Sequence, residues 1–212
     1  FDQKISSLQT RVDEIKKQLS PQEQKRKKQR LVVDLSWASS RIEGNTYSLL
    51  ETESLIEHME TAHGKKYTEA KMILNHKQAI EFIRTYREDY QELNRTKIFE
   101  LHQILIDGLE VETGLRKQLV RISNSSFVPC DNEFQITQTL DEIIQAINQT
   151  ASVLQKAIMA NLLIAFLQPF ADGNKRTSRM LGNAILVSNG RLPLSFTHTP
   201  KDDYIKSILN FY

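Results

Sequence analysis

The residues of this chain that are best suited to chemistry lie together between residues 168 and 179. Asp172 and Gly173 are followed within a few residues by two arginines, Arg176 and Arg179. Glycine lets a backbone approach a phosphate closely, and two guanidinium groups three residues apart on a helix can grip the same polyphosphate. The Asp172 carboxylate is a hard oxygen ligand that suits a magnesium ion bridging phosphates. This spacing indicates a site for a phosphorylated ligand.

Two apolar helices must position this stretch. Residues 136–167 are richly apolar and contain no glycine or proline, so they predict a core helix with a break near residues 148–151. Pro169 ends that helix, and a second apolar helix is expected over residues 177–189. The stretch therefore precedes a helix N-terminus, where free N–H groups and the positive end of the helix dipole favour an anion.

On spacing alone, a solvated polar turn between two buried helices explains the stretch equally well. The full pattern is more specific, because it resembles the signature loop of the Fic family of nucleotidyl transferases. The matching residues are Phe170, Asp172, Gly173, Asn174, Arg176 and Arg179. The family's loop begins with a histidine, and Gln168 stands in that position here. We refer to residues 168–179 as the signature loop.

The resemblance implies that AMP is transferred from ATP to a Ser, Thr or Tyr hydroxyl of a target protein. It implies that Asp172 binds Mg²⁺ and that Phe170 anchors the loop in the core. The residues that it assigns to ATP are Gly173, Asn174, Lys175, Arg176 and Arg179. Gln168 occupies the catalytic position, but an amide has no pKa in a usable range and cannot act as a general base.

Losing a general base typically lowers a rate by about 10² to 10⁴. Three explanations of Gln168 stay open: a divergent family member, an engineered substitution, or a transfer whose nucleophile needs no base. Two other classes of function stay open as well. One is a non-catalytic ATP-binding regulator, and the other is a partner-binding or DNA-associated protein that would contact nucleic acid only through a domain outside this chain.

Residues 39–45 resemble the inhibitory motif of self-restrained Fic proteins, with Ser39 followed by Glu43 and Gly44. The resemblance implies that Glu43 pairs with Arg179 and denies that arginine to the ATP γ-phosphate. We therefore expect Glu43 within hydrogen-bonding reach of Arg176 or Arg179, and Gln168 and Arg179 in one pocket. The alternative is an ordinary helix C-terminus, with Gly44 as a left-handed cap and Glu43 exposed.

Residues 114–129 resemble the flap of Fic proteins. Apolar residues flank a Ser/Asn turn at residues 123–126, which predicts a small β-hairpin. These apolar residues are Val120, Ile122, Phe127 and Val128. The edge of such a hairpin would hold the target protein in extended form along Arg121 to Val128. The helix before the flap contains His102, which is expected to be a half-buried structural histidine.

The expected fold is all-α, a Fic helical bundle with one small β-hairpin flap. We divide the chain into an N-terminal helical segment (residues 1–34), an inhibitory-motif region (35–62) and a Fic core (63–212). The first core helices are expected over residues 68–89 and 95–109. The chain begins at Phe1 rather than at Met, so we expect it to be part of a longer polypeptide.

The N-terminal segment has an apolar stripe at helical spacing that breaks at Ser20 and Pro21. The stripe consists of Ile5, Leu8, Val12, Ile15 and Leu19. It predicts an amphipathic helix against the core. The alternative is a helix pair, either within the chain or between two chains that would form a homodimer. The basic run at residues 25–30 is interpreted as a solvated helix face rather than a site for nucleic acid or acidic lipid.

Composition fits an intracellular, cytoplasmic protein. The single cysteine, Cys130, excludes an internal disulfide, and no zinc-ligand spacing is present. The sequence contains no stretch of 18 or more apolar residues and no signal peptide, so it indicates neither a membrane span nor export. The net charge of +2 is too small to argue for a nucleic-acid partner.

Overall fold

The computed structural model describes residues 2–122 and 125–212, and at residues 2–6 and 16 it describes the backbone alone. This described part is built from helices and contains no β-strand, which confirms the predicted all-α class. In chain order the elements are α1 (Asp2–Gln18), α2 (Pro21–Ile42), α3 (Leu49–His58), α4 (Tyr67–Thr85), the 3-10 helix η1 (Arg87–Tyr90), α5 (Arg95–Ile106), α6 (Glu133–Gln149), α7 (Val153–Leu167), α8 (Asn174–Ser188) and α9 (Lys201–Phe211).

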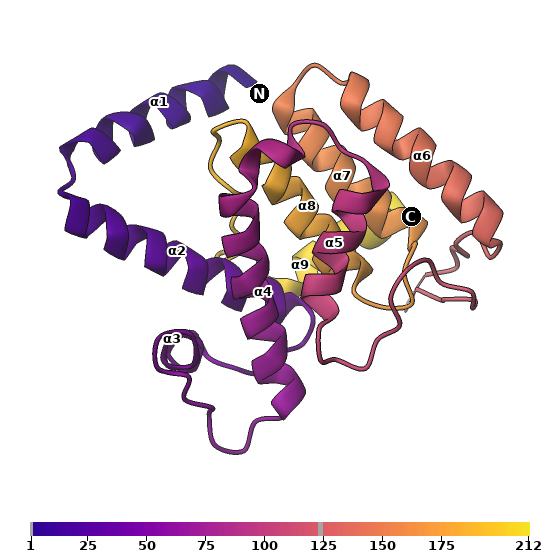
Figure 1. The fold of residues 1–212 in the computed structure, drawn as a ribbon, viewed down its shortest axis with the longest axis horizontal. Helices are drawn as coiled ribbons and strands as arrows, with labels where there is room; N and C mark the ends of the chain where they lie inside the picture. Colours follow the sequence, from indigo (N-terminus) through magenta and orange to yellow (C-terminus); the bar gives the residue numbers. More distant parts are fainter. Residues whose placement is uncertain (1, 123–124) are drawn as a thin grey trace.

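Helices α7 and α8 pack against each other at the centre of the molecule (Figure 1). Their backbones approach closely because small residues meet: a Cβ atom on Gly182 would come within 2.8 Å of the Ala157 carbonyl oxygen. Helices α4 and α5 pack on α8, and α6 packs on α7. Helix α8 is therefore buried along nearly its whole length. Because its first turn carries part of the signature loop, the buried pair gives that loop a rigid base.

The helix boundaries follow the sequence predictions closely around this pair. The predicted break near residues 148–151 is confirmed, because α6 ends at Gln149 and α7 begins at Val153. Helix α8 begins at Asn174, earlier than the predicted Thr177, because Gly173 serves as its N-cap in a left-handed conformation with a φ of 82°. The helix expected over residues 68–89 is divided into α4 and η1.

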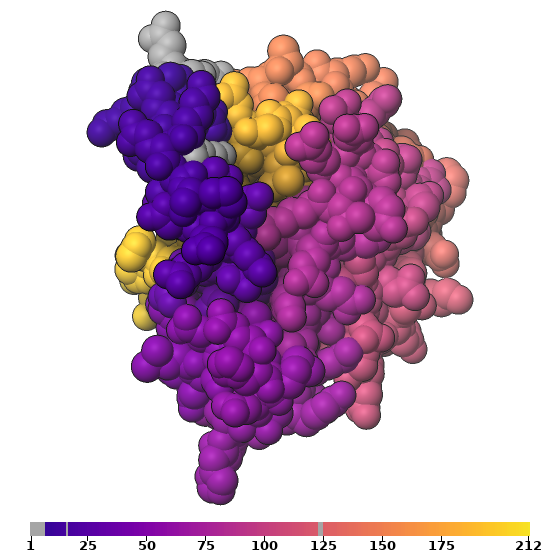
Figure 2. Space-filling view, turned by 60° about the vertical axis from the view of Figure 1, so that its left-hand side comes forward, coloured from indigo at the N-terminus to yellow at the C-terminus, as the bar shows by residue number. Residues whose placement is uncertain are grey.

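The N-terminal helices α1 and α2 extend from one side of this core (Figures 1 and 2). They separate where predicted, because the Ser20 side chain caps α2 in a reciprocal pairing with Glu23 and Pro21 opens the helix. The apolar stripe of α1 is only partly buried: Leu8 is 50% exposed and Ile15 is 49% exposed. Ile5 lies outside the described side chains. The homodimer therefore stays a prediction.

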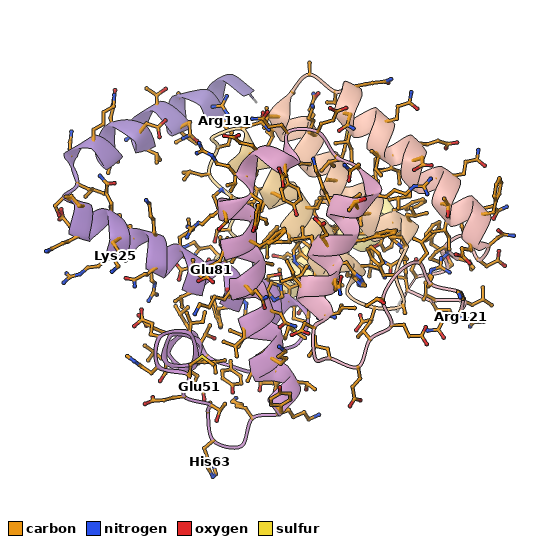
Figure 3. All side chains as sticks on the ribbon, viewed as in Figure 1. Lys25, Glu51, His63, Glu81, Arg121 and Arg191 are labelled. Atoms are coloured by element: carbon orange, nitrogen blue, oxygen red, sulfur yellow. The ribbon has the colours of Figure 1, made fainter. Side chains whose placement is uncertain are left out.

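Helix α2 runs without interruption across residue 34, where the first two predicted regions meet. Its first half carries the basic run at residues 25–30, which is exposed throughout and from which Lys25 points outward (Figure 3). Arg30 pairs with Asp34 at 3.1 Å and with Glu53 of α3 at 3.4 Å. These contacts agree with a solvated helix face. None of the described helices is long and apolar enough to cross a lipid bilayer.

The flap between α5 and α6 is not the predicted β-hairpin. Its described residues form no strand, and Ser123 and Asn124 of the expected turn lie outside the described residues. Side chains fasten the segment instead: the ring of Phe127 stacks on Phe166 of α7, with centroids 4.2 Å apart. A lone two-stranded hairpin is only marginally stable, and Pro129 has no N–H to donate to a strand ladder. Anchoring by side chains therefore takes the place of strand pairing.

Candidate functional site

Phe170 holds the signature loop in the core, as the sequence predicted. Its side chain is 0% exposed, and its ring stacks on His102 of α5 with centroids 3.6 Å apart. The Asn174 side chain closes the loop, since it accepts from the Phe170 N–H at 2.9 Å and donates to the Phe170 carbonyl at 2.8 Å. The Asn174 amide is thus used inside the protein. A ligand would meet Asn174 through its backbone N–H.

Gly173 sits at the tightest point of the loop, against α5. A Cβ atom at this position would lie 3.0 Å from Ile106 and 3.4 Å from the His102 ring, and the φ of 82° favours glycine further. Because Gly173 is the N-cap of α8 and has no side chain, it leaves the first N–H groups of that helix without a side-chain cap. Uncapped N–H groups at the positive end of a helix attract an anion.

An open cavity of about 380 Å³ lies at this helix start. Its walls are mainly polar and come from the end of α2, the flap and the signature loop. The lining residues are Glu43, Gln118, Leu119, Val120, Arg121, Gln168, Ala171, Asp172, Gly173, Asn174 and Lys175. The structure therefore brings together the three regions that the sequence singled out.

Arg179 does not line this cavity, and the prediction that it shares a pocket with Gln168 is wrong in that respect. The reason is Glu43, which does line the cavity and covers the Arg179 guanidinium. Arg179 Nη2 donates to Glu43 Oε1 at 2.7 Å, and the two side chains are 1% and 23% exposed. The expected contact between Glu43 and the loop arginines is therefore present. Gly44, with a φ of 94°, ends α2 beside it.

The charges of this pair stabilise each other. Burial by itself raises the pKa of Glu43, but Arg179, with smaller contributions from Arg176 and Lys175, outweighs burial and holds that pKa below its ordinary value. Burial by itself lowers the pKa of Arg179, but Glu43 and Tyr204 together outweigh burial, so this pKa is raised. Both groups stay ionised at neutral pH and form a charge-assisted hydrogen bond.

Arg176 connects the signature loop to α5 by hydrogen bonds. Its Nη1 donates to the Leu105 carbonyl at 3.3 Å, its Nη2 donates to Asp172 Oδ2 at 3.2 Å, and its side chain is 4% exposed. The Asp172 side chain is 69% exposed and lines the cavity. In the described part of the chain, no group of three or more His, Cys, Asp or Glu side chains could hold a metal ion. Because Mg²⁺ is often bound by one carboxylate together with phosphate oxygens, Asp172 suits a Mg²⁺ ion whose other ligands include a bound polyphosphate.

Gln168 lies at the C-terminal end of α7 in a left-handed conformation, with a φ of 51°. Such a conformation is strained for a residue other than glycine, and Pro169 directly follows it. The Gln168 side chain donates from Nε2 to the Ala165 carbonyl and lines the cavity. No histidine is among the described residues that line the cavity, so no imidazole takes the place of the family's base.

Arg116 of the flap is a structural residue that sequence reasoning missed. It is 2% exposed, and its Nε donates to the Gln168 carbonyl at 2.6 Å. Its two Nη atoms donate to the carbonyls of Gln118, at 3.0 Å, and Cys130. One guanidinium thus fastens both ends of the flap to the strained turn at Gln168. Backbone carbonyls leave no mark in a sequence, so nothing in the sequence distinguished Arg116 from the other basic residues of the flap, Lys117 and Arg121.

The two histidines nearest the site are buried and neutral. His102 is 1% exposed, more buried than expected, and its Nε2 donates to the Asp172 carbonyl at 2.9 Å. Burial lowers the pKa of His102 to about 4, and it lowers the pKa of His76, on α4, to about 3. The structural role expected for His102 agrees with these contacts. His76 received no role from the sequence.

Comparison with known proteins places this geometry in a family. The Fic/DOC family pattern matches residues 92–186. Protein adenylyltransferase fic-1 from Caenorhabditis elegans is 26% identical over 174 residues, which cover 79% of this chain and 34% of that protein. Protein adenylyltransferase Fic from Nematostella vectensis is 28% identical over 171 residues, which cover 78% of this chain and 40% of that protein. The chain thus spans less than half the length of these relatives.

Solved structures share the fold. The structure of Fic-1 from C. elegans has a TM-score of 0.77 at 23% identity, and the match covers 99% of this chain and 63% of that one. A Fic domain containing signaling protein from Bacteroides thetaiotaomicron has a TM-score of 0.75 at 20% identity, with 90% of this chain and 75% of that one covered. The family match and this fold agree: residues 92–186 match the Fic/DOC family, and the chain has the fold of solved Fic proteins.

Proposed function

We propose that this chain is a Fic-type protein adenylyltransferase, restrained by Glu43 and weakened in its chemistry by Gln168. The substrates would be ATP and a Ser, Thr or Tyr hydroxyl of a target protein. The observation that carries the proposal is the Glu43 carboxylate, which lies in the cavity wall and is bonded to Arg179 at 2.7 Å. Under this proposal, residues 35–62 contain the inhibitory Glu43, and residues 63–212 form the transferase core.

The nucleotide-binding role of the loop is supported by its unused donors. The first N–H groups of α8 have no side-chain cap, and Lys175 lines the cavity beside them. Buried Arg179 Nη1 makes no hydrogen bond of ordinary geometry within the described residues. These groups suit the oxygens of a polyphosphate. A magnesium ion held by Asp172 and the phosphates would neutralise charge that develops on them.

Restraint by Glu43 follows from competition for one guanidinium. A γ-phosphate that reaches Arg179 must displace the Glu43 carboxylate, which is a charge-assisted partner of similar strength. Glu43 lies at the C-terminal end of α2, and its side chain is 23% exposed, so it has water to turn toward. The restraint is therefore reversible in principle. Its removal requires no rearrangement of the core.

Recognition of the target protein is supported by the flap. Described residues of the stretch from Arg121 to Val128 take part in no strand pairing, and Val128 is 67% exposed. Arg121 lies at the outer end of the flap (Figure 3). An extended peptide can add to a segment that has no strand partner. Its hydroxyl would approach Gln168, which can accept a hydrogen bond from the hydroxyl but cannot take its proton.

The Gln168 amide also favours a second candidate function, a non-catalytic ATP-binding regulator. In that function ATP would displace Glu43 and shift the end of α2, and no transfer would follow. Both candidates need the same binding site. They differ in whether the scaffold supports transfer when a base is supplied.

The experiment that tests the proposal supplies the missing base. Glu43→Gly and Glu43→Gly/Gln168→His variants are incubated with ATP labelled at the α-phosphate, and label on the protein itself and on lysate proteins is measured. We expect the double variant to gain about 10² or more in rate, the usual worth of a general base. Gln168→Asn in the same background is the matched control and should gain nothing, because it also lacks a titratable proton.

If the double variant binds Mg-ATP and labels neither itself nor lysate proteins, the transferase proposal fails. The regulator would then be the better account of this chain.

A further inference from the structure

Arg179 is held by α2 through more than Glu43. Its Nε donates to Ser39 Oγ at 3.0 Å, and its Nη2 also donates to the Ser39 carbonyl at 3.2 Å. These two acceptors are neutral and belong to Ser39, a residue of α2 that is 6% exposed. They would remain in place if Glu43 left the guanidinium. Ser39 therefore fixes one edge of Arg179 whether or not Glu43 is bound.

A second buried residue, His76 of α4, contacts the same Ser39 hydroxyl. His76 is 0% exposed, and its Nε2 lies 2.9 Å from Ser39 Oγ. Its Nδ1 lies 2.8 Å from the Met72 carbonyl and 3.4 Å from Ser40 Oγ. The Ser39 hydroxyl thus stands between an imidazole nitrogen on one side and the Arg179 Nε–H on the other.

The proton positions in this chain of contacts follow from which atoms can donate. The Met72 carbonyl only accepts, so Nδ1 of His76 carries the proton. The buried neutral ring then has a free lone pair on Nε2, which accepts a hydrogen bond from the Ser39 hydroxyl. With its proton directed at His76, Ser39 Oγ presents a lone pair to Arg179 Nε. If the hydroxyl turned the other way, two donors would face each other.

We propose that His76 is a positioning residue for Arg179: by accepting a hydrogen bond from the Ser39 hydroxyl, it keeps a lone pair of Ser39 Oγ available to the Arg179 guanidinium. The inference rests on the proposed function where it assigns phosphate binding to Arg179. It adds that the arginine is oriented before nucleotide arrives. When Glu43 departs, one N–H of Nη2 becomes available, while the other stays bonded to the Ser39 carbonyl.

Calorimetry with Mg-ATP in the Glu43→Gly background tests the consequence for binding. Ser39→Ala and His76→Leu should each weaken binding about tenfold, the usual effect of losing one positioning hydrogen bond to a charged group. Combining the two should weaken binding no further than either does alone, because both break one chain of contacts. His76→Gln, which keeps an acceptor for the Ser39 hydroxyl, should stay within about twofold of the background.

Ser40→Ala is the matched control. Ser40 is the neighbour of Ser39 on α2, is 1% exposed and also contacts the His76 ring, but its hydroxyl does not reach Arg179. Its loss should leave Mg-ATP affinity unchanged. An equal loss for Ser40→Ala, or losses that add in the Ser39→Ala/His76→Leu variant, would overturn the proposal in favour of a packing role.

A measurement without nucleotide separates this inference from the proposed function. Nitrogen NMR should show His76 protonated at Nδ1 and unprotonated at Nε2. The Arg179 Nε–H should exchange slowly in the natural chain and in His76→Gln, and quickly in Ser39→Ala and His76→Leu. A proton on Nε2, or an unchanged exchange rate, would overturn the inference. If the Glu43→Gly variant binds no Mg-ATP, the proposed function fails while this readout still decides the role of His76.

Discussion

Two buried arginines, Arg116 beside the signature loop and Arg179 at its end, differ in what they bind. Arg116 of the flap donates to backbone carbonyls, including that of Gln168, and has no carboxylate among its hydrogen-bond partners in the described chain. Arg179 of α8 donates to Ser39 and to the carboxylate of Glu43. Each arginine is 2% exposed. Two arginine side chains in neighbouring regions thus bind different kinds of partner.

The difference separates a fixed joint from a releasable one. The carbonyls that bind Arg116 belong to the chain itself, so they cannot leave unless the flap and the turn at Gln168 come apart. The Glu43 carboxylate sits on a rotatable side chain at a helix end and is 23% exposed. It can leave Arg179 for water while α2 stays where it is. The Arg116 contacts are expected to govern stability, and the Arg179 contacts to govern ligand binding.

The largest effect should come from removing the fixed joint. Arg116→Met leaves three partly buried carbonyl oxygens without their donor, so the free energy of unfolding should fall by roughly 3 kcal/mol. Urea denaturation measures this loss. Arg95→Met is the matched control, since Arg95 pairs with Asp141 on the surface, where the side chains are 44% and 49% exposed. That change should cost at most about 1 kcal/mol. Equal losses at the two positions would break the comparison.

The next largest effect should come from acid, which weakens the core around His76 and His102. The folded-state pKa values of His76 and His102 are lowered to about 3 and about 4, from an ordinary value of 6.5. Below pH 6.5 the unfolded chain binds protons that the folded chain refuses, so stability present above that pH is lost as the pH falls. Between pH 7 and 5.5 the free energy of unfolding should fall by about 1 kcal/mol for each histidine.

Denaturation at several pH values, with His76→Gln as the comparison, checks this prediction. The variant should lose the share of the slope that belongs to His76 and keep the share of His102. A slope that is the same in both proteins would show that His76 titrates normally in the folded state.

A smaller stability effect is expected at the releasable joint. Glu43→Gln keeps the shape and one hydrogen bond but removes the charge, so at neutral pH the free energy of unfolding should fall by about 1 kcal/mol. Because the pKa of Glu43 is lowered in the folded state, this contribution is present above the ordinary value of 4.5 and disappears as the pH falls below it. Glu57→Gln, at an exposed position of α3, is the control and should change nothing measurable. A larger loss at Glu43 than at Arg116 would reverse the assignment of the two joints.

The releasable joint was predictable from the sequence, and the fixed joint was not. Glu43 and Arg179 lie in motifs that resemble those of Fic proteins, and that resemblance implied their pairing. Arg116 binds backbone carbonyls, which every residue has. The same reason explains the flap: its alternating apolar residues favoured a hairpin, but contacts such as Phe127 on Phe166 anchor it without strand pairing.

The helices were predicted well where one strong signal decides the boundary. Pro169 and the apolar run before it fixed the end of α7, and Ser20 with Pro21 fixed the start of α2. The start of α8 was placed too late, because the tertiary contacts that hold Gly173 against α5 are invisible in the local sequence. The burial of Asn174 and Arg176 within the loop was hidden for the same reason. Both had been assigned to the ligand, and both brace the protein itself.

Calorimetry of Mg-ATP with the natural chain and with Glu43→Gly tests the central claim, that Glu43 closes the site by occupying Arg179. Losing a competing charge-assisted partner should tighten binding by about tenfold or more. The natural chain should bind weakly under the same conditions. Equal affinities in the two proteins would contradict the account, because Glu43 would then touch Arg179 without restraining it.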